Sequence, residues 1–478
     1  MSSLCSQMTD GKGAAMDKRL VCAIVASGSL NFCGIVVETS MNVTFPTLMR
    51  EFGVGTATVQ WVTSGYLLVL AVLIPVFAYL RRRFSTRALF CMAIGLFVSG
   101  TVLGVVAPAF PVLLMARFLQ GAGASIGLPL MYDIIMARVP KDRVGMMMGI
   151  AALIPAVAPT IGPSLGGFMV SVASWRMIFG VLLPLVVAAL ALGLYGLSAD
   201  KASERRAFGD TPHFDAIGFV LLSIGFVSFV LGVNGASEVG WLGFRTLLLF
   251  ALTALALSVF GFWARRIEHP LLNVAPLCNP VFLFGLAPVV GVQLIILGLG
   301  YLIPNFAQLV LGESALRAGV IMLPGCILAA SLSPISGRLL DRFGPRLPVS
   351  VGMLAVIAAP LCFAVSAPHL SFALTVGLYV LFGIGQGNAL GNSMTHALKQ
   401  LPQEHAADGN SIANTAQQLA SALGTSLAST CVAAAQMGIA DTSAATLVGS
   451  TTAFYLLAMV GAVSLVGATL SFKMAKKA

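Results

Sequence analysis

Long apolar runs dominate this sequence of 478 residues and decide what the chain can fold into. Fourteen such runs, bounded by charged residues or by Pro and Gly, approach or exceed the roughly 20 residues that an α-helix needs to cross a bilayer. Only 9% of the residues are charged, against about a quarter in soluble domains, which excludes an ordinary water-soluble protein. The predicted spans are 20–46, 57–80, 88–107, 110–135, 146–172, 177–198, 214–235, 245–264, 280–311, 316–337, 347–367, 370–394, 408–436 and 447–471. The sequence therefore predicts an all-α integral membrane protein with 14 transmembrane helices.

The positions of the basic residues support an even number of spans. With the N-terminus inside, 22 of the 27 Lys and Arg residues fall in cytoplasmic segments, and only Arg50, Arg176, Arg245 and Arg317 fall outside. Cytoplasmic loops of membrane proteins carry this excess of positive charge. We expect a multi-pass protein of the cell membrane with both termini cytoplasmic. The net charge of +10 then follows from topology, and no nucleic-acid partner is expected.

Two similar basic segments suggest an internal duplication. The first hinge, Ala78 to Arg87 (AYLRRRFSTR), follows the second span, and the second hinge, Gly337 to Arg346 (GRLLDRFGPR), follows the tenth. This predicts a six-helix half over 1–198, a cytoplasmic loop with a two-helix insert over 199–279, and a second six-helix half over 280–478. Repeated halves with a site between them are typical of transporters.

Two charged residues fall inside predicted spans. Arg117 lies seven residues into the fourth span, where a charge costs about 2.5–3.5 kcal/mol and marks a functional site by default. Glu38 is the only carboxylate well inside the first span. Both lie about 10–12 Å from the outer end at 1.5 Å per residue. We expect them to be partners, either as a poised proton site or as a static ion pair.

The fifth span carries Pro155, Pro159 and Pro163 at every fourth position and ends in GPSLGG, Gly162 to Gly167. Proline on one stripe bends a helix, and small residues allow close packing. This pattern predicts a bent helix whose small residues, Gly166 and Gly167 among them, permit close packing.

These motifs resemble the fourteen-helix drug:proton antiporter branch of the major facilitator superfamily, over nearly the whole chain. The second hinge fits the superfamily motif G-x-L-x-D-R-x-G-x-R at Gly337, Leu339, Asp341, Arg342, Gly344 and Arg346. RFLQGAG from Arg117 fits R-x-x-Q-G of the fourth helix, which includes Gln120, and GPSLGG fits G-P-x-x-G-G. WRMIF from Trp175, FDAIG from Phe214 and YLIPNFAQLVLG from Tyr301 also resemble this branch.

Two positions depart from the family patterns. The first hinge has Ala78, Arg82 and Ser85 where the motif has Gly, Asp and Gly, so its latch is altered, and Asp133 would supply the missing carboxylate to Arg81–Arg83. In the first helix the family acid stands nine residues before the motif proline. That place is Val37 here, and Glu38 is one step later. Asp133 is therefore the second candidate for proton coupling.

Amide side chains inside the spans are candidates for the substrate cavity. They are Gln120, Asn305, Gln308, Gln386, Asn388, Asn392, Asn414 and Gln417. Amides between helices can equally hold the helices together by hydrogen bonds. Both interpretations stay open for each residue.

The resemblance implies proton-coupled export of amphipathic, cationic organic compounds by alternating access, with a small molecule and protons as partners. Export of one specific metabolite, a carrier without proton coupling and a non-transporting membrane sensor remain alternatives. No phosphate-binding loop or metal-ligand cluster occurs. We expect no enzyme activity, no cofactor, no metal and a monomer in the bilayer.

Overall fold

The computed structural model describes residues 18–139, 158–159, 161–198, 214–240, 243–267, 270–402 and 405–476. Within these ranges every regular element is a helix. Twelve of the helices are long and apolar enough to cross a membrane. This confirms an all-helical, multi-pass membrane protein.

The helices before residue 200 follow the first six predicted spans, with one interruption. The second span is broken, because Pro75 lies in a 3-10 turn between two α-helices. Of the fifth span, only the part from residue 158 is described, as helix Ile161–Val172. The elements are α2 (Lys18–Phe52), α3 (Thr56–Val59), α4 (Trp61–Leu73), η1 (Ile74–Val76), α5 (Phe77–Arg83), α6 (Thr86–Val106), α7 (Phe110–Arg138), helix Ile161–Val172 and α9 (Met177–Gly196).

The helices after residue 213 are longer and more continuous. Helix α18 is 33 residues long but is rich in hydroxyl and amide groups. The elements are α11 (Ala216–Val239), α12 (Phe244–Ala264), η2 (Ala275–Cys278), α13 (Pro280–Leu309), α14 (Ala315–Val320), α15 (Leu323–Phe343), α16 (Arg346–Ser366), η3 (Ala367–His369), α17 (Phe372–Leu398), α18 (Ala406–Gly438) and α19 (Thr442–Ala475).

Short polar side chains begin several helices by accepting hydrogen bonds from the first free backbone N–H groups. Asn279 Oδ1 accepts from the N–H of Val281 at 2.9 Å at the start of α13. The other side-chain caps are Ser85, Asp215, Ser314, Ser371 and Asp441. These residues therefore determine where their helices begin.

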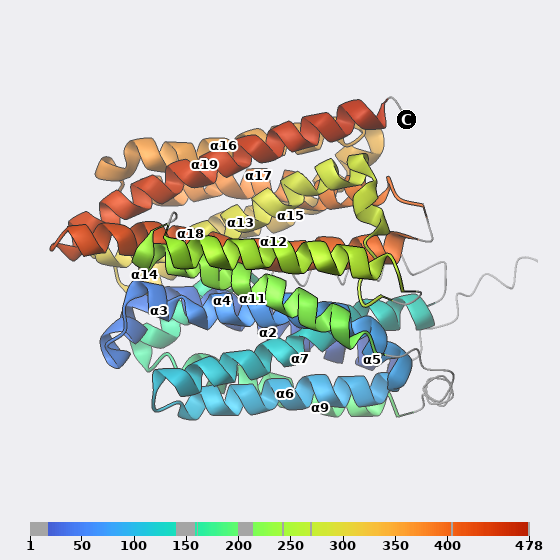
Figure 1. The fold of residues 1–478 in the computed structure, drawn as a ribbon. Coiled ribbons are helices and arrows are strands. Elements are labelled where there is room, and N and C mark those ends of the chain that lie inside the picture. The colour runs from blue at the N-terminus through green and yellow to red at the C-terminus, as the bar shows by residue number, and fades with distance from the viewer. Residues whose placement is uncertain are drawn as a thin grey trace, which may run out of the picture.

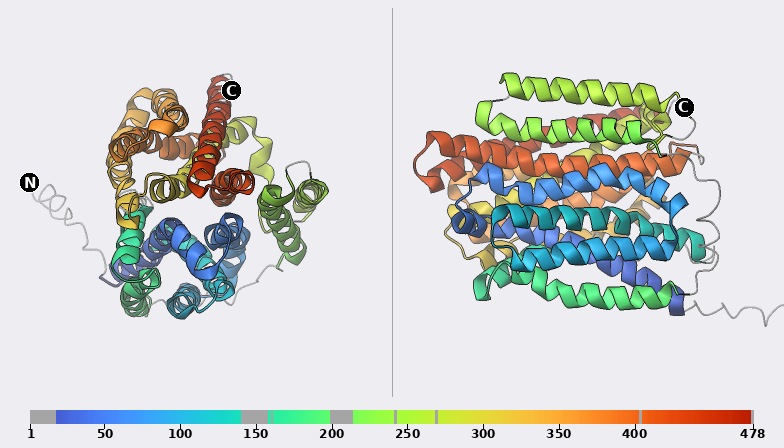
Figure 2. Two further views of the ribbon diagram at one scale, coloured as in Figure 1. Left: turned by 90° about the vertical axis from the view of Figure 1, so that its left-hand side faces the viewer. Right: turned by 60° about the horizontal axis from the view of Figure 1, so that its bottom comes forward.

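The helices form two bundles and a flanking pair (Figures 1 and 2). The first bundle holds α2 to α9, drawn in blue to green-cyan, and the second holds α13 to α19, drawn in yellow to red. Helices α11 and α12, in green, lie at the side, where α11 packs against both α4 and α18. We name the two ends of the molecule by the first helix: the Lys18 end, where α2 begins, and the Phe52 end, where it finishes.

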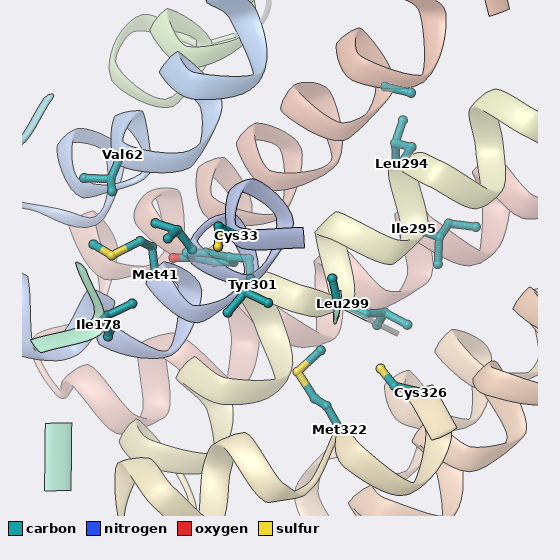
Figure 3. Packing of buried hydrophobic residues seen from close by; sticks show 14 of the residues in the cluster. Cys33, Met41, Val62, Ile178, Leu294, Ile295, Leu299, Tyr301, Met322 and Cys326 are labelled. Carbon is teal, nitrogen blue, oxygen red and sulfur yellow. The ribbon is translucent and has the colours of Figure 1, made fainter. Parts of the chain in front are cut away.

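The apolar core runs continuously from one bundle into the other. Cys33 and Met41 on α2 lie beside Tyr301 and Leu299 on α13 (Figure 3). A second cluster joins α4, α11 and α18 through residues such as Leu67, Phe226 and Ala422. The flanking pair is therefore packed onto the junction between the bundles on one side.

Candidate functional site

Glu38 lies on α2, buried with 8% of its surface exposed. Its side chain forms no hydrogen bond or ion pair with any residue in the described ranges. In that part of the chain it is the only buried carboxylate. A carboxylate removed from water without a partner is costly in the charged form, so the site favours a proton or a cation.

Arg117 on α7 is fully buried and held by neutral groups. Its Nε donates to the carbonyl of Val62 at 3.0 Å, and Nη1 donates to Gln120 Oε1 at 2.7 Å. The guanidinium carbon lies 4.2 Å from the ring centre of Tyr66 on α4. Nη2 has no hydrogen-bond partner among the described residues. The Nη2 nitrogen of Arg117 is therefore a buried donor without an acceptor among the described residues.

The two charges are near enough to interact electrostatically, but they form no ion pair. The predicted partnership therefore holds only in the weaker sense of neighbouring charges. Tyr66 lies against Arg117, and its hydroxyl is 3.1 Å from the position that a Cβ on Gly34 would take. Gly34 is one turn of α2 away from Glu38. No pattern in the sequence pointed to Tyr66, since one aromatic residue in an apolar span forms no periodic signal.

Gln120 is fully buried between α7 and α6. It accepts from Arg117 and donates from Nε2 to Thr101 Oγ1 at 3.0 Å, and Thr101 in turn donates to the carbonyl of Phe97. The amide thus holds Arg117 against α6. A place for Gln120 in the substrate cavity stays a prediction.

Helix Ile161–Val172 packs so closely that its glycines leave no space for a side chain. A Cβ on Gly166 would lie 2.5 Å from the carbonyl oxygen of Ser40, and one on Gly167 would lie 2.2 Å from that of Ala315. Ser40 also donates to the carbonyl of Gly162 at 2.6 Å. The helix thus joins α2 to the second bundle. Pro155 lies outside the described residues, whereas Pro159 and Pro163 lie within them.

Side-chain hydrogen bonds between the bundles occur toward the Phe52 end. Thr56 Oγ1 donates to Gln436 Oε1 at 2.7 Å, and the hydroxyls of Ser64 and Ser426 are 3.1 Å apart. Between these two bonds, Gln60 Nε2 donates to Asn234 Oδ1 of α11 at 2.7 Å. We call the stripe of Thr56, Gln60 and Ser64 the polar seam. Its spacing of four residues is the only signal by which the sequence could have revealed it.

The two hinges at the Lys18 end differ. In the first, Arg81 Nε pairs with Asp133 Oδ2 at 2.5 Å, so Asp133 lies where the altered motif needs a carboxylate. The pKa of Arg138, which interacts with both residues of this pair, is lowered first by burial and then by the positive charge of Arg81. A role of Asp133 in proton coupling stays a prediction.

In the second hinge, Gly344 ends α15 with φ 74°, a conformation that glycine adopts easily. Gly337, the first residue of the motif, lies inside α15. Arg342 is in the last turn of α15, and Arg346 begins α16. The side chain of Asp341 lies outside the described residues.

The amides of the second bundle fall into two groups. Asn392 donates to Ser336 Oγ at 2.6 Å, and Gln308 donates to the carbonyl of Val43 at 3.1 Å, so these two join helices. Asn305, Asn388 and Asn414 each donate to a carbonyl of their own helix.

Two further amides are half-buried. Gln417 Nε2 lies 3.9 Å from the sulfur of Met394, and Gln386 lies on α17. Among the residues that the structure describes, no group of three or more His, Cys, Asp or Glu side chains is placed to hold a metal ion.

Comparison with known proteins places these features in a family. The family model described as Major Facilitator Superfamily matches residues 28–425. The chain is 32% identical to the lincomycin resistance protein LmrB of Listeria monocytogenes over 413 residues, 86% of each chain. It is 30% identical to a multidrug resistance protein B homolog of Mycobacterium tuberculosis, over 82% of this chain and 72% of that one.

Solved structures share the fold. A bacterial homolog of the human lysosomal transporter Spinster, inward-facing and unoccupied, superposes with a TM-score of 0.66 at 16% identity, covering 96% of this chain and 98% of that one. A POT family transporter gives a TM-score of 0.65 at 15% identity, over 95% and 96% of the two chains.

Proposed function

Because the chain belongs to the Major Facilitator Superfamily, and is therefore a membrane transporter rather than an enzyme, we propose that it exports amphipathic, cationic organic compounds in exchange for protons. The observation that carries this proposal is Glu38, a buried carboxylate in the middle of a span with no hydrogen-bonding partner in the described ranges. Relatives named for multidrug and lincomycin resistance support drug export.

Glu38 offers one negative charge that either a proton or a cationic substrate neutralises. Arg117 stays beside Glu38, because Val62, Gln120 and Tyr66 hold it there. The positive charge of Arg117 disfavours the binding of a proton and a cationic substrate at the same time. Exchange follows: a proton from outside displaces the substrate, and substrate from inside displaces the proton. The drive is about 2.3 kcal/mol per charge per 100 mV, plus about 1.4 kcal/mol per pH unit.

The proposed topology has 14 transmembrane helices. To the twelve apolar helices it adds α18 and the span that ends in helix Ile161–Val172. The halves 1–198 and 280–478 move against each other, with the insert over 199–279 between them. Both termini, and hence the Lys18 end, are cytoplasmic, and the unit is a monomer.

In this topology the present conformation is closed on the outside. The polar seam and the backbone contacts of Gly167 with Ala315 join the halves at the Phe52 end. Export requires these contacts to break so that substrate can leave. A seam of hydrogen bonds and small residues suits this, because each contact is weak and reversible.

The test is ethidium uptake into proteoliposomes with an imposed pH gradient, comparing the wild type with Glu38→Gln. Glutamine keeps the size of the side chain but can take up neither a proton nor a charge. Glu313→Gln is the matched control, since Glu313 pairs with Arg317 four residues away, whose side chain is 56% exposed. A pair that is open to solvent on the arginine side contributes about 0–1 kcal/mol, so transport should be unchanged.

We expect the gradient-driven uptake to collapse in Glu38→Gln and to persist in the control. Uptake that survives in Glu38→Gln contradicts the role of Glu38 and makes Asp133→Asn the next variant. Absence of wild-type uptake for several lipophilic cations overturns cation export and favours a specific metabolite carrier or a sensor.

A further inference from the structure

Helix α2 carries a buried polar line between its Lys18 end and Glu38. Ser27 and Asn31 are one turn apart, and Asn31 is two turns from Glu38, so the three residues share one face of the helix. Their exposed fractions are 0%, 4% and 8%. Polar side chains along one face of a membrane-buried helix are costly without partners.

Ser27 and Asn31 are short of partners. Ser27 Oγ and Asn31 Oδ1 are buried and accept or donate no hydrogen bond within the described residues. The amide nitrogen of Asn31 reaches only the carbonyl of Gly127 at 3.3 Å and the sulfur of Met131 at 3.8 Å, both on α7. Buried polar atoms of this kind are rare, and those that occur commonly bind ordered water.

The spacing between the polar groups on α2 fits one or two water molecules for each step. Ser27 and Asn31 are about 6 Å apart along the helix axis at 1.5 Å per residue. One water that makes two hydrogen bonds of about 2.8 Å at a tetrahedral angle spans about 4.5 Å, and two waters in series span about 7 Å. Between Asn31 and Glu38 the hydroxyl of Tyr66 approaches Gly34 closely and divides the longer gap. Each step is thus within reach of one or two waters.

We propose that Ser27 and Asn31 hold a file of water along α2 through which Glu38 releases its proton toward the Lys18 end. The proposal rests on proton exchange at Glu38. The O–H bond of the protonated Glu38 breaks, a water takes the proton, and successive waters pass it on until it enters the aqueous phase. The Ser27 hydroxyl both accepts and donates a proton, whereas Asn31 positions water without changing its charge.

The groups that face Glu38 are consistent with this direction of release. Arg117 from α7 and the ring of Tyr66 from α4 interact electrostatically with it. From α13, Tyr301 lies in the apolar core beside Met41, on the Phe52 side of Glu38. Toward the Lys18 end the polar line is formed by uncharged groups, so a passing proton meets no fixed positive charge on Ser27 or Asn31.

The experiment compares two modes of ethidium transport in proteoliposomes containing the full chain. Uptake driven by a pH gradient requires net proton release, whereas exchange of ethidium across equal pH requires none. The variants are Asn31→Leu, which keeps the branching at Cγ and removes hydrogen bonding, and Ser27→Ala. Ser125→Ala on α7 is the control, because that buried hydroxyl already donates to the carbonyl of Ala122 at 2.8 Å.

We expect Asn31→Leu to slow driven uptake several-fold while leaving exchange at the wild-type rate. Ser27→Ala should do so more weakly, Ser125→Ala should change neither mode, and Asn31→Ser should recover part of the driven rate. Equal loss in both modes would mean that Asn31 only packs α2 against α7, and no loss in either mode also overturns the file.

Two further results separate this proposal from the function on which it rests. If Glu38→Gln abolishes driven uptake but Asn31→Leu and Ser27→Ala do not, proton exchange stands and the water file is wrong. If Glu38→Gln leaves driven uptake intact, the coupling site itself is wrong. Should Asn31→Leu fail to fold, the ratio of driven uptake to exchange in Ser27→Ala decides.

Discussion

The interiors of the two bundles differ in charge. The first bundle buries a carboxylate and a guanidinium, Glu38 and Arg117, in the middle of its helices. The buried polar groups of the second bundle in the described ranges are uncharged hydroxyls and amides, with one histidine, His396, near the Lys18 end. Two bundles of similar architecture therefore have different chemistry inside.

This difference suggests a division of labour between the bundles. Charged groups in a membrane interior are retained where a proton or an ion must be handled. Neutral amides and hydroxyls instead form hydrogen bonds between helices, which average about 0.6 kcal/mol in membrane proteins. We infer that coupling resides in the first bundle, and that the second supplies the surface against which the first one moves.

The largest effect should come from Arg117→Leu, which removes the only buried guanidinium of the described residues. Two charge-assisted hydrogen bonds and the contact with Tyr66 disappear, and Glu38 loses its neighbouring cation. Breaking such a buried arrangement costs about 3–5 kcal/mol. We expect both driven uptake and ethidium exchange to be lost, measured in proteoliposomes at equal protein content.

Arg117→Lys distinguishes charge from geometry. Lysine keeps the positive charge but cannot reproduce the fixed fork of the guanidinium. We expect exchange to return in part, with weakened proton coupling. Full activity of Arg117→Leu would mean that the charge asymmetry between the bundles has no function.

The next effect concerns closure at the Phe52 end. A Cβ on Gly319 would lie 2.1 Å from the carbonyl oxygen of Pro163, so Gly319→Ala should push the bundles apart there. Gly337→Ala is the matched control, because nothing lies within 4 Å of a Cβ at that position. Spin labels at Gly55 and Met437, in a cysteine-free background, should report a longer distance in Gly319→Ala only. An unchanged distance would show that the contact yields without separating the bundles.

The residue patterns predicted the helical class and the family, since long apolar runs and basic loops report membrane topology directly. Glu38 and Arg117 were found because a charge inside an apolar run is visible without a structure. Their local partners were not. Whether Arg117 bonds to Glu38 or to Gln120 depends on how α2 and α7 rotate about their axes, and apolar helices encode that rotation weakly.

The amides show the same limit. Asn392 and Asn388 stand one turn apart on α17, yet the first joins α15 and the second bonds only its own helix. Tyr66 and Asn31 escaped prediction because single uncharged residues carry no periodic signal, and the polar seam was missed although its three residues recur at every fourth position. Contacts between segments far apart in the chain determine which amide joins two helices and which does not.

A smaller effect should come from the neutral bonds of the second bundle. Asn392→Leu removes the short bond to Ser336 and leaves that hydroxyl only its long contact with the carbonyl of Asn388, whereas Asn414→Leu removes only exposed bonds within α18. Interhelical bonds of this kind contribute up to about 1.7 kcal/mol. We expect Asn392→Leu to lower the melting temperature in detergent and Asn414→Leu to leave it unchanged. A large loss of proton coupling in Asn392→Leu, with the fold intact, would contradict the division of labour.

The smallest effect should come from the bond between the bundles at Ser64 and Ser426. Ser64→Ala, Ser426→Ala and the double variant form a cycle, read as the ratio of closed to open populations from the spin-label distances at Gly55 and Met437. If the two hydroxyls bond only when the Phe52 end is closed, each single variant should favour the open state, and the double variant should add little more. A coupling energy near 0.6 kcal/mol corresponds to about a threefold change in that ratio. Additive single effects would mean that each serine acts inside its own bundle, and that the amides Gln60 and Gln436 hold the polar seam closed without the serines.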